Sequence, residues 1–274
     1  MTPTFLRKRI VSVFNAYVKK VAEYVEEVRG RGGQVREFDS PAAVSELAEG
    51  LPVRVGPGAS SGVILRGDTF VELGSPDAGS CAFLLWTDDP SLIRDGKITL
   101  IGPDIKETPG ASLPFGQVLM VAGKDLGKEE HSALEQSQYI SDQVEGYMIR
   151  STPERMWSRV GKDAAAKGFD FCTLGKALMT IFKSDVPKVQ AMEAIFVTSS
   201  KEDVQRLDDI AQQVRKISKD IVRETWLARG YDVLECTLGW DCESCTDKPV
   251  CDEIKEVITV RKKKAGKPPE VTQS

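Results

Sequence analysis

The chain has 274 residues, of which 41% are hydrophobic and 28% are charged, so it has enough apolar side chains for a globular core. Its net charge of −4 argues against a nucleic-acid-binding protein, because such proteins carry a basic face. No apolar stretch reaches the roughly 18–20 residues of a membrane span. The N-terminus also lacks the pattern of a secretory signal, so we expect a cytoplasmic protein.

Residues 1–50 are predicted to be a helical N-terminal segment. Apolar residues recur three and four positions apart from Ile10 to Val28, which places them on one face of a helix. Glycines at positions 30, 32 and 33 end this helix, and Ser40-Pro41 predicts a short second helix. We expect the apolar face to pack within the same molecule, with packing against another subunit as the alternative.

Residues 51–230 are predicted to form an α+β domain. Short β-rich runs between Gly, Pro and Asp residues predict strands at 51–55, 62–65, 69–73, 81–86, 97–101 and 116–122. Their close spacing favours hairpins, and hence an antiparallel or mixed sheet, over βαβ units. A further buried strand is predicted at 190–198. Packed helices are predicted at 129–150, 153–167, 174–182 and from Ser200 to about residue 230.

Residues 231–274 are predicted to be a small cysteine-cluster region with a basic tail. Its cysteines follow the spacing C-x5-C-x2-C-x5-C and are Cys236, Cys242, Cys245 and Cys251. A reducing cytoplasm disfavours structural disulfides, so these thiols predict a metal centre. Four thiolates suit an iron–sulfur cluster or a structural zinc. Zinc fingers usually separate their two ligand pairs by about a dozen residues or more, so this short loop favours the cluster. The alternatives are a zinc ion, redox disulfides or unliganded thiols.

The remaining candidate groups exclude several common enzyme classes. Cys81 and Cys172 stand alone and are predicted to be core thiols. His131 is the single histidine, so the sequence supports neither a histidine-based catalytic triad nor a histidine-rich metal site. No phosphate-binding P-loop, dinucleotide fingerprint or serine-hydrolase motif occurs in the chain.

Several strings of residues between Leu51 and Cys251 have a specific order and spacing. They include Leu51-Pro-Val-Arg-Val-Gly-Pro57, Phe70-Val-Glu-Leu-Gly74, Asp95-Gly-Lys-Ile-Thr-Leu-Ile-Gly-Pro-Asp104, Leu113-Pro-Phe-Gly116 and Met156-Trp-Ser-Arg-Val-Gly-Lys-Asp-Ala164. Together they resemble the middle region of the acetyl-CoA synthase β subunit of the CO dehydrogenase/acetyl-CoA synthase complex. The resemblance covers roughly three quarters of the chain, and it implies a subunit of a multi-protein complex.

The resemblance also implies a 4Fe–4S cluster on the four cysteines. In that family the cluster is bridged to two nickel ions, and the distal nickel is held by a Cys-Gly-Cys motif. This sequence contains no Cys-x-Cys before Ser274, and its cysteine spacing is tighter than the family's. We therefore expect a truncated relative that lacks the nickel-binding portion, and we do not expect this chain alone to synthesise acetyl-CoA.

A role in CoA handling follows from the same resemblance, because the family's middle domain is associated with CoA through basic residues near a tryptophan. Trp157 and Arg159 match that motif here. Arg155 and Lys162 share a face with Arg159 on the helix predicted at 153–167, and arginine side chains suit phosphate groups. The alternative is an amphipathic helix with a solvated basic face and a buried tryptophan.

Three functions are compatible with these patterns. The leading hypothesis is an iron–sulfur subunit that transfers electrons or docks a partner in anaerobic one-carbon or acyl-CoA metabolism. The second is an enzyme that binds CoA or an acyl-CoA and uses the cluster directly. The third is a scaffold whose metal is structural and whose N-terminal helix binds a partner protein.

Overall fold

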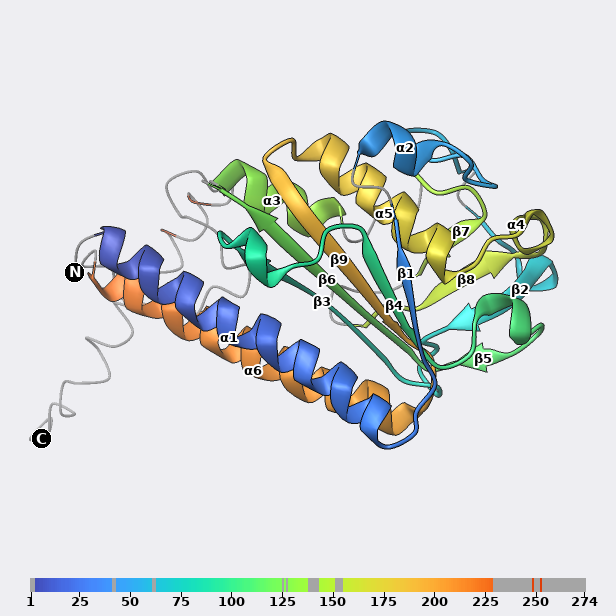
Figure 1. Cartoon of the computed structure of the whole chain (residues 1–274), viewed down its shortest axis with the longest axis horizontal. Coiled ribbons are helices and arrows are strands. Elements are labelled where there is room, and N and C mark those ends of the chain that lie inside the picture. The colour runs from blue at the N-terminus through green and yellow to red at the C-terminus, as the bar shows by residue number, and fades with distance from the viewer. Residues whose placement is uncertain are drawn as a thin grey trace, which may run out of the picture. The chain divides into compact units, whose positions relative to one another are not determined.

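The computed structural model describes residues 3–40, 43–60, 63–124, 126, 128–137, 143–150, 155–228, 248 and 252. Residues 2–215 form one compact unit, and residues 216–274 fall in a second unit together with Met1. The first unit has two β-sheets with packed helices, which confirms the predicted α+β fold (Figure 1). No helix in the described ranges is long and apolar enough to cross a membrane.

The larger sheet has five strands in the order β1-β4-β9-β6-β3. Their bounds are Val35–Asp39 for β1, Ser80–Thr87 for β3, Lys97–Ile101 for β4, Phe115–Gly123 for β6 and Val189–Val197 for β9. The central strand, β9, runs parallel to β4 and antiparallel to β6. The sheet is therefore mixed, as predicted, but no two neighbouring strands are consecutive in the sequence, so it contains none of the expected hairpins.

The smaller sheet has the strand order β5-β2-β8-β7. Its strands are Thr69–Leu73 (β2), Ser112–Leu113 (β5), Tyr147–Ile149 (β7) and Ser158–Gly161 (β8). Strands β7 and β8 are antiparallel, and β8 also pairs antiparallel with β2. A short helix, α4, follows β8 directly and spans Lys162–Lys167. The β2–β3 connection joins this sheet to the larger one, so it lies at the boundary between them.

Helices cover both faces of the larger sheet (Figure 1). One face carries α2, α3 and α5, and the other carries α1 and α6. Their bounds are Pro3–Gly30 for α1, Val44–Ala48 for α2, Lys128–Ser137 for α3, Phe171–Asp185 for α5 and Lys201–Ala228 for α6. Side chains of β6 alternate between the two cores, since Leu119 packs on the α5 side and Val118 and Met120 pack on the α1 side.

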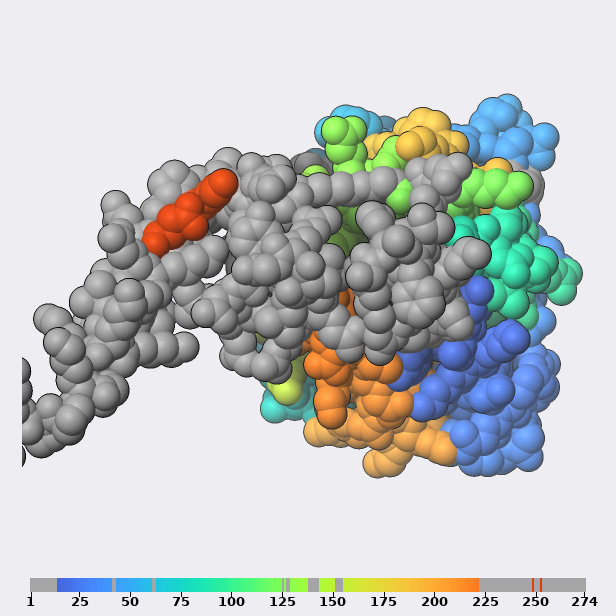
Figure 2. Space-filling model, turned by 90° about the vertical axis from the view of Figure 1, so that its left-hand side faces the viewer, coloured from blue at the N-terminus to red at the C-terminus, as the bar shows by residue number. Residues whose placement is uncertain are grey.

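The apolar face predicted on the N-terminal helix packs within the molecule. Phe14, Val21, Tyr24 and Val28 are all buried in the core that α1 forms with the sheet and with α6. Figure 2, viewed from another side, shows the blue side chains of α1 directly beside the orange side chains of α6. The expected packing within the molecule is therefore confirmed for the described side chains of this helix.

Several predicted elements are wrong. Residues 51–55 form no strand, apart from one isolated bridge between Val55 and Val144, and residues 63–65 form none either. The helix predicted at 129–150 ends at Ser137 in its described part, and β7 lies inside the predicted range. Strand β1 lies in the segment predicted to be helical throughout, because its pairing with β4 outweighs the short and charged local pattern.

The helix predicted at 153–167 is also wrong in its first part. Residues 158–161 form β8, because their backbone pairs with β2 on one side and with β7 on the other. The hydroxyl of Tyr147 on β7 lies 2.9 Å from that of Ser158 on β8, and both residues are buried. The alanines at 164–166 do form the predicted helix, but it begins only at Lys162.

Strands β2 and β4 have the bounds that the sequence predicts, and β3, β6, β9, α5 and α6 overlap their predicted ranges closely. The four clustered cysteines lie outside the described residues, so the metal centre stays a prediction. The division of the chain at residues 50 and 230 also stays a prediction.

Candidate functional site

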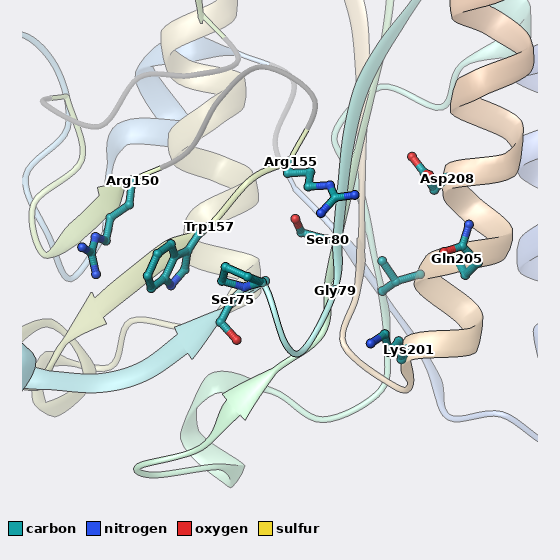
Figure 3. Close-up of a pocket in the computed structure, with 12 residues that line it drawn as sticks. Ser75, Gly79, Ser80, Arg150, Arg155, Trp157, Lys201, Gln205 and Asp208 are labelled. Atoms are coloured by element: carbon teal, nitrogen blue, oxygen red, sulfur yellow. The ribbon is translucent and has the colours of Figure 1, made fainter.

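A cavity of about 440 Å³ lies beside the β2–β3 connection and the start of α6 (Figure 3). Three segments form its walls. The first is the loop from Gly74 to Ser80, the second is the β7–β8 connection with Arg150, Arg155 and Trp157, and the third is the first two turns of α6. The cavity therefore collects side chains from both sheets and from a helix that follows them in the sequence.

Hydrogen bonds fix the shape of the loop wall. The hydroxyl of Ser75 lies 2.9 Å from that of Ser112, and it accepts a hydrogen bond from the backbone N–H of Ala78. The ammonium of Lys201 donates to the carbonyl of Asp77 at 3.2 Å, which ties the loop to α6. Gly79 has φ of +89°, and a Cβ there would lie 3.4 Å from the Lys201 side chain. A Cβ at that distance would make only an ordinary contact with the lysine, so the positive φ is what favours glycine at this position.

The aromatic wall consists of Trp157 backed by Arg150. The guanidinium carbon of Arg150 lies 4.2 Å from the centroid of the indole ring, and the backbone N–H of Arg150 donates to the carbonyl of Trp157 at 2.6 Å. Figure 3 shows the indole between Arg150 and the loop that carries Ser75. The indole Nε1 is buried and has no hydrogen-bond partner within the described ranges. Such a donor costs free energy unless a ligand or water accepts from it.

The charges in the cavity wall are mainly positive. Arg150, Arg155 and Lys201 supply three cations, whereas Asp208 supplies one carboxylate. In the part of the chain that the structure describes, Arg155 forms no ion pair, and Figure 3 shows its guanidinium extended toward α6. Since an anion would gain Coulomb energy and charge-assisted hydrogen bonds here, the cavity suits a negatively charged ligand.

The carboxylate of Asp208 is already engaged on the α6 wall. It accepts a hydrogen bond from the Gln212 side chain at 2.7 Å, and the guanidinium of Arg215 lies 3.6 Å away. Burial raises the pKa of the Cys81 thiol above its ordinary value, and the nearby Asp208 carboxylate raises it further. Cys81 is thus a protonated core thiol, as predicted, and Cys172 is half-buried.

Two of the four residues predicted to handle CoA line the cavity, and two do not. Arg155 and Trp157 lie in its wall. Arg159 instead pairs with Glu72 at 2.6 Å and donates to the carbonyl of Ile64, with only 11% of its side chain exposed. Lys162 donates to the carbonyl of Gly67 at 2.7 Å. The helix face predicted for Arg155, Arg159 and Lys162 is wrong, because only Lys162 belongs to a helix: Arg155 precedes β8, Arg159 lies on β8 and Lys162 is the first residue of α4.

Sequence reasoning missed the α6 side of the cavity. Lys201, Gln205 and Asp208 lie more than forty positions after Trp157, and no local pattern links the two segments. The one signal available was the loop Gly74-Ser-Pro-Asp-Ala-Gly79, whose glycine at each end is typical of a tight connection beside a site. Among the described residues, no group of three or more His, Cys, Asp or Glu side chains is arranged to hold a metal ion.

Comparison with known proteins identifies similar sequences. A sequence model of the family described as CO dehydrogenase/acetyl-CoA synthase complex beta subunit matches residues 51–204, more than half of the chain. The match contains both sheets except β1, and it extends to the first turn of α6. It therefore covers the loop, aromatic and first-turn helix walls of the cavity, whereas α1 lies outside it.

Three relatives illustrate the similarity. The acetyl-CoA decarbonylase/synthase complex subunit beta of Archaeoglobus fulgidus is 27% identical over 237 residues, which are 85% of this chain and 42% of the relative. The corresponding subunit of Methanopyrus kandleri is 32% identical over 76% of this chain and 44% of its own. The carbon monoxide dehydrogenase/acetyl-CoA synthase subunit alpha of Moorella thermoacetica is 30% identical over 73% and 27%, respectively. The chain spans less than half the length of these relatives.

Proposed function

Because the chain belongs to the CO dehydrogenase/acetyl-CoA synthase complex beta subunit family, we propose that it binds CoA or an acyl-CoA in this cavity. The observation that carries the proposal is an aromatic face and three cations in one cavity. CoA combines an adenine ring, which stacks on aromatic side chains, with phosphate groups, which bind arginine and lysine. The cavity volume lies within the range of about 300–1,000 Å³ that is usual for small-molecule sites.

In this proposal each wall has its own task. The indole of Trp157 stacks on the adenine, and Arg150 holds the indole in place. Arg155 and Lys201 bind the phosphates. The names of the relatives include the words complex and subunit, so we also propose that this chain works within a multi-subunit assembly.

We expect Arg155→Ala to raise the dissociation constant for CoA by roughly ten-fold, since it removes a charge-assisted contact. Trp157→Ala is expected to weaken binding by a similar or larger factor through lost stacking. Isothermal titration calorimetry of the full chain with CoA and with acetyl-CoA measures the dissociation constants of both variants.

The matched control is Lys162→Ala, which removes a cation of the same predicted set that does not line the cavity. Its dissociation constant for CoA should equal that of the wild-type protein. Equal weakening by Lys162→Ala and Arg155→Ala would mean that the effect is a general loss of positive charge. The absence of binding to the wild-type protein would contradict the proposed function.

A second proposal concerns the cysteine spacing C-x5-C-x2-C-x5-C. We propose that Cys236, Cys242, Cys245 and Cys251 hold a 4Fe–4S cluster, which would supply one-electron transfer or order the segment for docking a partner. The donor chemistry fits, because four thiolates are the usual ligand set of such clusters. A four-thiolate zinc, serving a scaffold, is the alternative that the same donors allow.

Protein purified without oxygen should contain about four iron atoms and four sulfides per chain, and Cys242→Ser should remove most of both. Cys172→Ser is the control, because this half-buried thiol lies outside the quartet. Metal and sulfide analysis together with electron paramagnetic resonance of the reduced protein gives the answer. One tightly bound zinc without sulfide would support the scaffold and contradict electron transfer.

A further inference from the structure

The first turns of α6 have two opposite faces with different neighbours. Lys201, Val204, Gln205 and Asp208 follow one another at helical spacing and line the cavity. Asp203 and Arg206 lie on the other side of the helix, where they contact α1. The helix is therefore a wall of the cavity on one side and a partner of α1 on the other.

Asp203 is the centre of the contact with α1. The phenolic hydroxyl of Tyr24 on α1 donates to its backbone carbonyl at 3.0 Å in a buried position, and the guanidinium of Arg31, in the turn just after α1, pairs with its Oδ1 at 2.8 Å. Its Oδ2 accepts from the hydroxyl of Ser199 at 2.6 Å, just before the helix begins. Only 8% of Asp203 is exposed. Burial alone would raise the pKa of this carboxyl, but the hydrogen bonds from Ser199 and Arg31 lower it overall.

Two further contacts extend this interface along both helices. Glu27 of α1 forms a salt bridge with Arg206, and the ammonium of Lys20 donates to the side chain of Gln213 at 2.6 Å. The contacts to Asp203 and Arg206 fall within the same two turns that carry the cavity residues. A shift of α1 would therefore move the cavity wall, because a helix turn moves as one rigid body over this length.

We propose that Tyr24 and Arg31 are positioning residues for the ligand cavity: by holding Asp203, they fix the turns of α6 that form one cavity wall. The ligand in this proposal, CoA, rests on the proposed function. Since α1 lies outside the region that the family model matches, the helix adds an outer support to the shared fold. By thermodynamic linkage, a ligand that binds the supported wall also stabilises the docking of α1.

The test compares two arginines of nearly equal exposure, two positions apart. Arg31 has 46% of its side chain exposed and pairs with α6, whereas Arg29 has 45% exposed and pairs with Glu37 of β1. In the full chain we expect Arg31→Ala to raise the dissociation constant for CoA roughly five-fold or more. Hydrogen exchange of the amides at 203–208 should also accelerate in the ligand-free protein. Arg29→Ala should change neither quantity.

Two milder variants keep the test valid if Arg31→Ala unfolds the protein. Tyr24→Phe removes only the hydroxyl that donates to Asp203, and it should produce a smaller change in the same direction. Arg31→Lys keeps the charge and should restore part of the affinity. A merely structural contact would lower the melting temperature of Arg31→Ala and leave its CoA affinity unchanged.

The outcomes separate this inference from the proposed function. If CoA binds all four variants as it binds the wild-type protein, the positioning inference is wrong and the proposed function stands. If CoA does not bind the wild-type protein, the proposed ligand is wrong. In that case unchanged exchange at 203–208 in Arg31→Ala overturns the support by α1, and faster exchange in Arg31→Ala but not in Arg29→Ala supports it.

Discussion

Asp95→Ala is expected to lower the free energy of unfolding by about 3 kcal/mol. Both carboxylate oxygens of Asp95 accept from the ammonium of Lys183, at 2.8 and 2.9 Å, and one of them also accepts from the backbone N–H of Met192 on β9. Only 7% of the Lys183 side chain is exposed. The substitution removes a carboxylate that pairs with a buried ammonium, which costs far more than losing a surface ion pair.

Asp39→Ala is the matched control, because Asp39 pairs with Arg94 at 2.8 Å while both side chains are more than 60% exposed. Asp39→Ala should lower the free energy of unfolding by less than about 1 kcal/mol. Guanidinium unfolding curves of the two variants give both values. Adding Lys183→Met to Asp95→Ala should restore part of the lost stability, since the buried charge is then also gone. Equal values for the two aspartates would contradict a buried pair.

Gly74→Ala is expected to cost about 3 kcal/mol or more of stability. Gly74 has φ of +70°, which is strained for any residue with a Cβ. A Cβ at this position would also lie 2.4 Å from the carbonyl oxygen of Met156 and 2.7 Å from the Cβ of Ser80, so the backbone around it would have to move. Because Met156 precedes Trp157, the displacement would reach the cavity, and CoA binding should weaken as well.

Gly110→Ala separates the backbone strain of a positive φ from the steric clash of an added Cβ. Gly110 has nearly the same φ, +74°, but a Cβ there would meet no atom within 4 Å. This variant should therefore show only the backbone strain, about 1–2 kcal/mol, and leave CoA affinity unchanged. Thermal and denaturant unfolding of both variants measures the difference. If Gly110→Ala costs as much as Gly74→Ala, the close approach to Met156 contributes nothing.

Local patterns predicted the helices and strands whose own residues show clear periodicity or clear end signals. Strand β2 alternates and is bounded by turns, and α6 carries a long apolar face after a serine and two acidic residues. Strands β1 and β8 escaped prediction because both are short and contain charged residues that are satisfied only by distant partners. The local sequence pattern places Arg159 of β8 on the basic face of a helix, but its partner is Glu72, 87 positions earlier.

The site was predictable to the same extent. Trp157 and Arg155 were predicted from a single segment and from the family resemblance, and both line the cavity. The opposite wall required the packing of α6 against the β2–β3 loop, which no sequence spacing encodes. Parallel pairing was equally hidden: the short distances between β-rich runs favour hairpins, whereas β3 actually pairs with β6 across two intervening strands.

The central position of β9 affects how the larger sheet folds during synthesis. Strand pairs β1–β4 and β3–β6 both lie before residue 124, and β9 joins them only at 189–197. During synthesis the edges of β4 and β6 that pair with β9 therefore stay unpaired until β9, more than sixty residues later in the sequence, has been made. Such long-range closure makes folding slow and leaves the edges open to wrong partners.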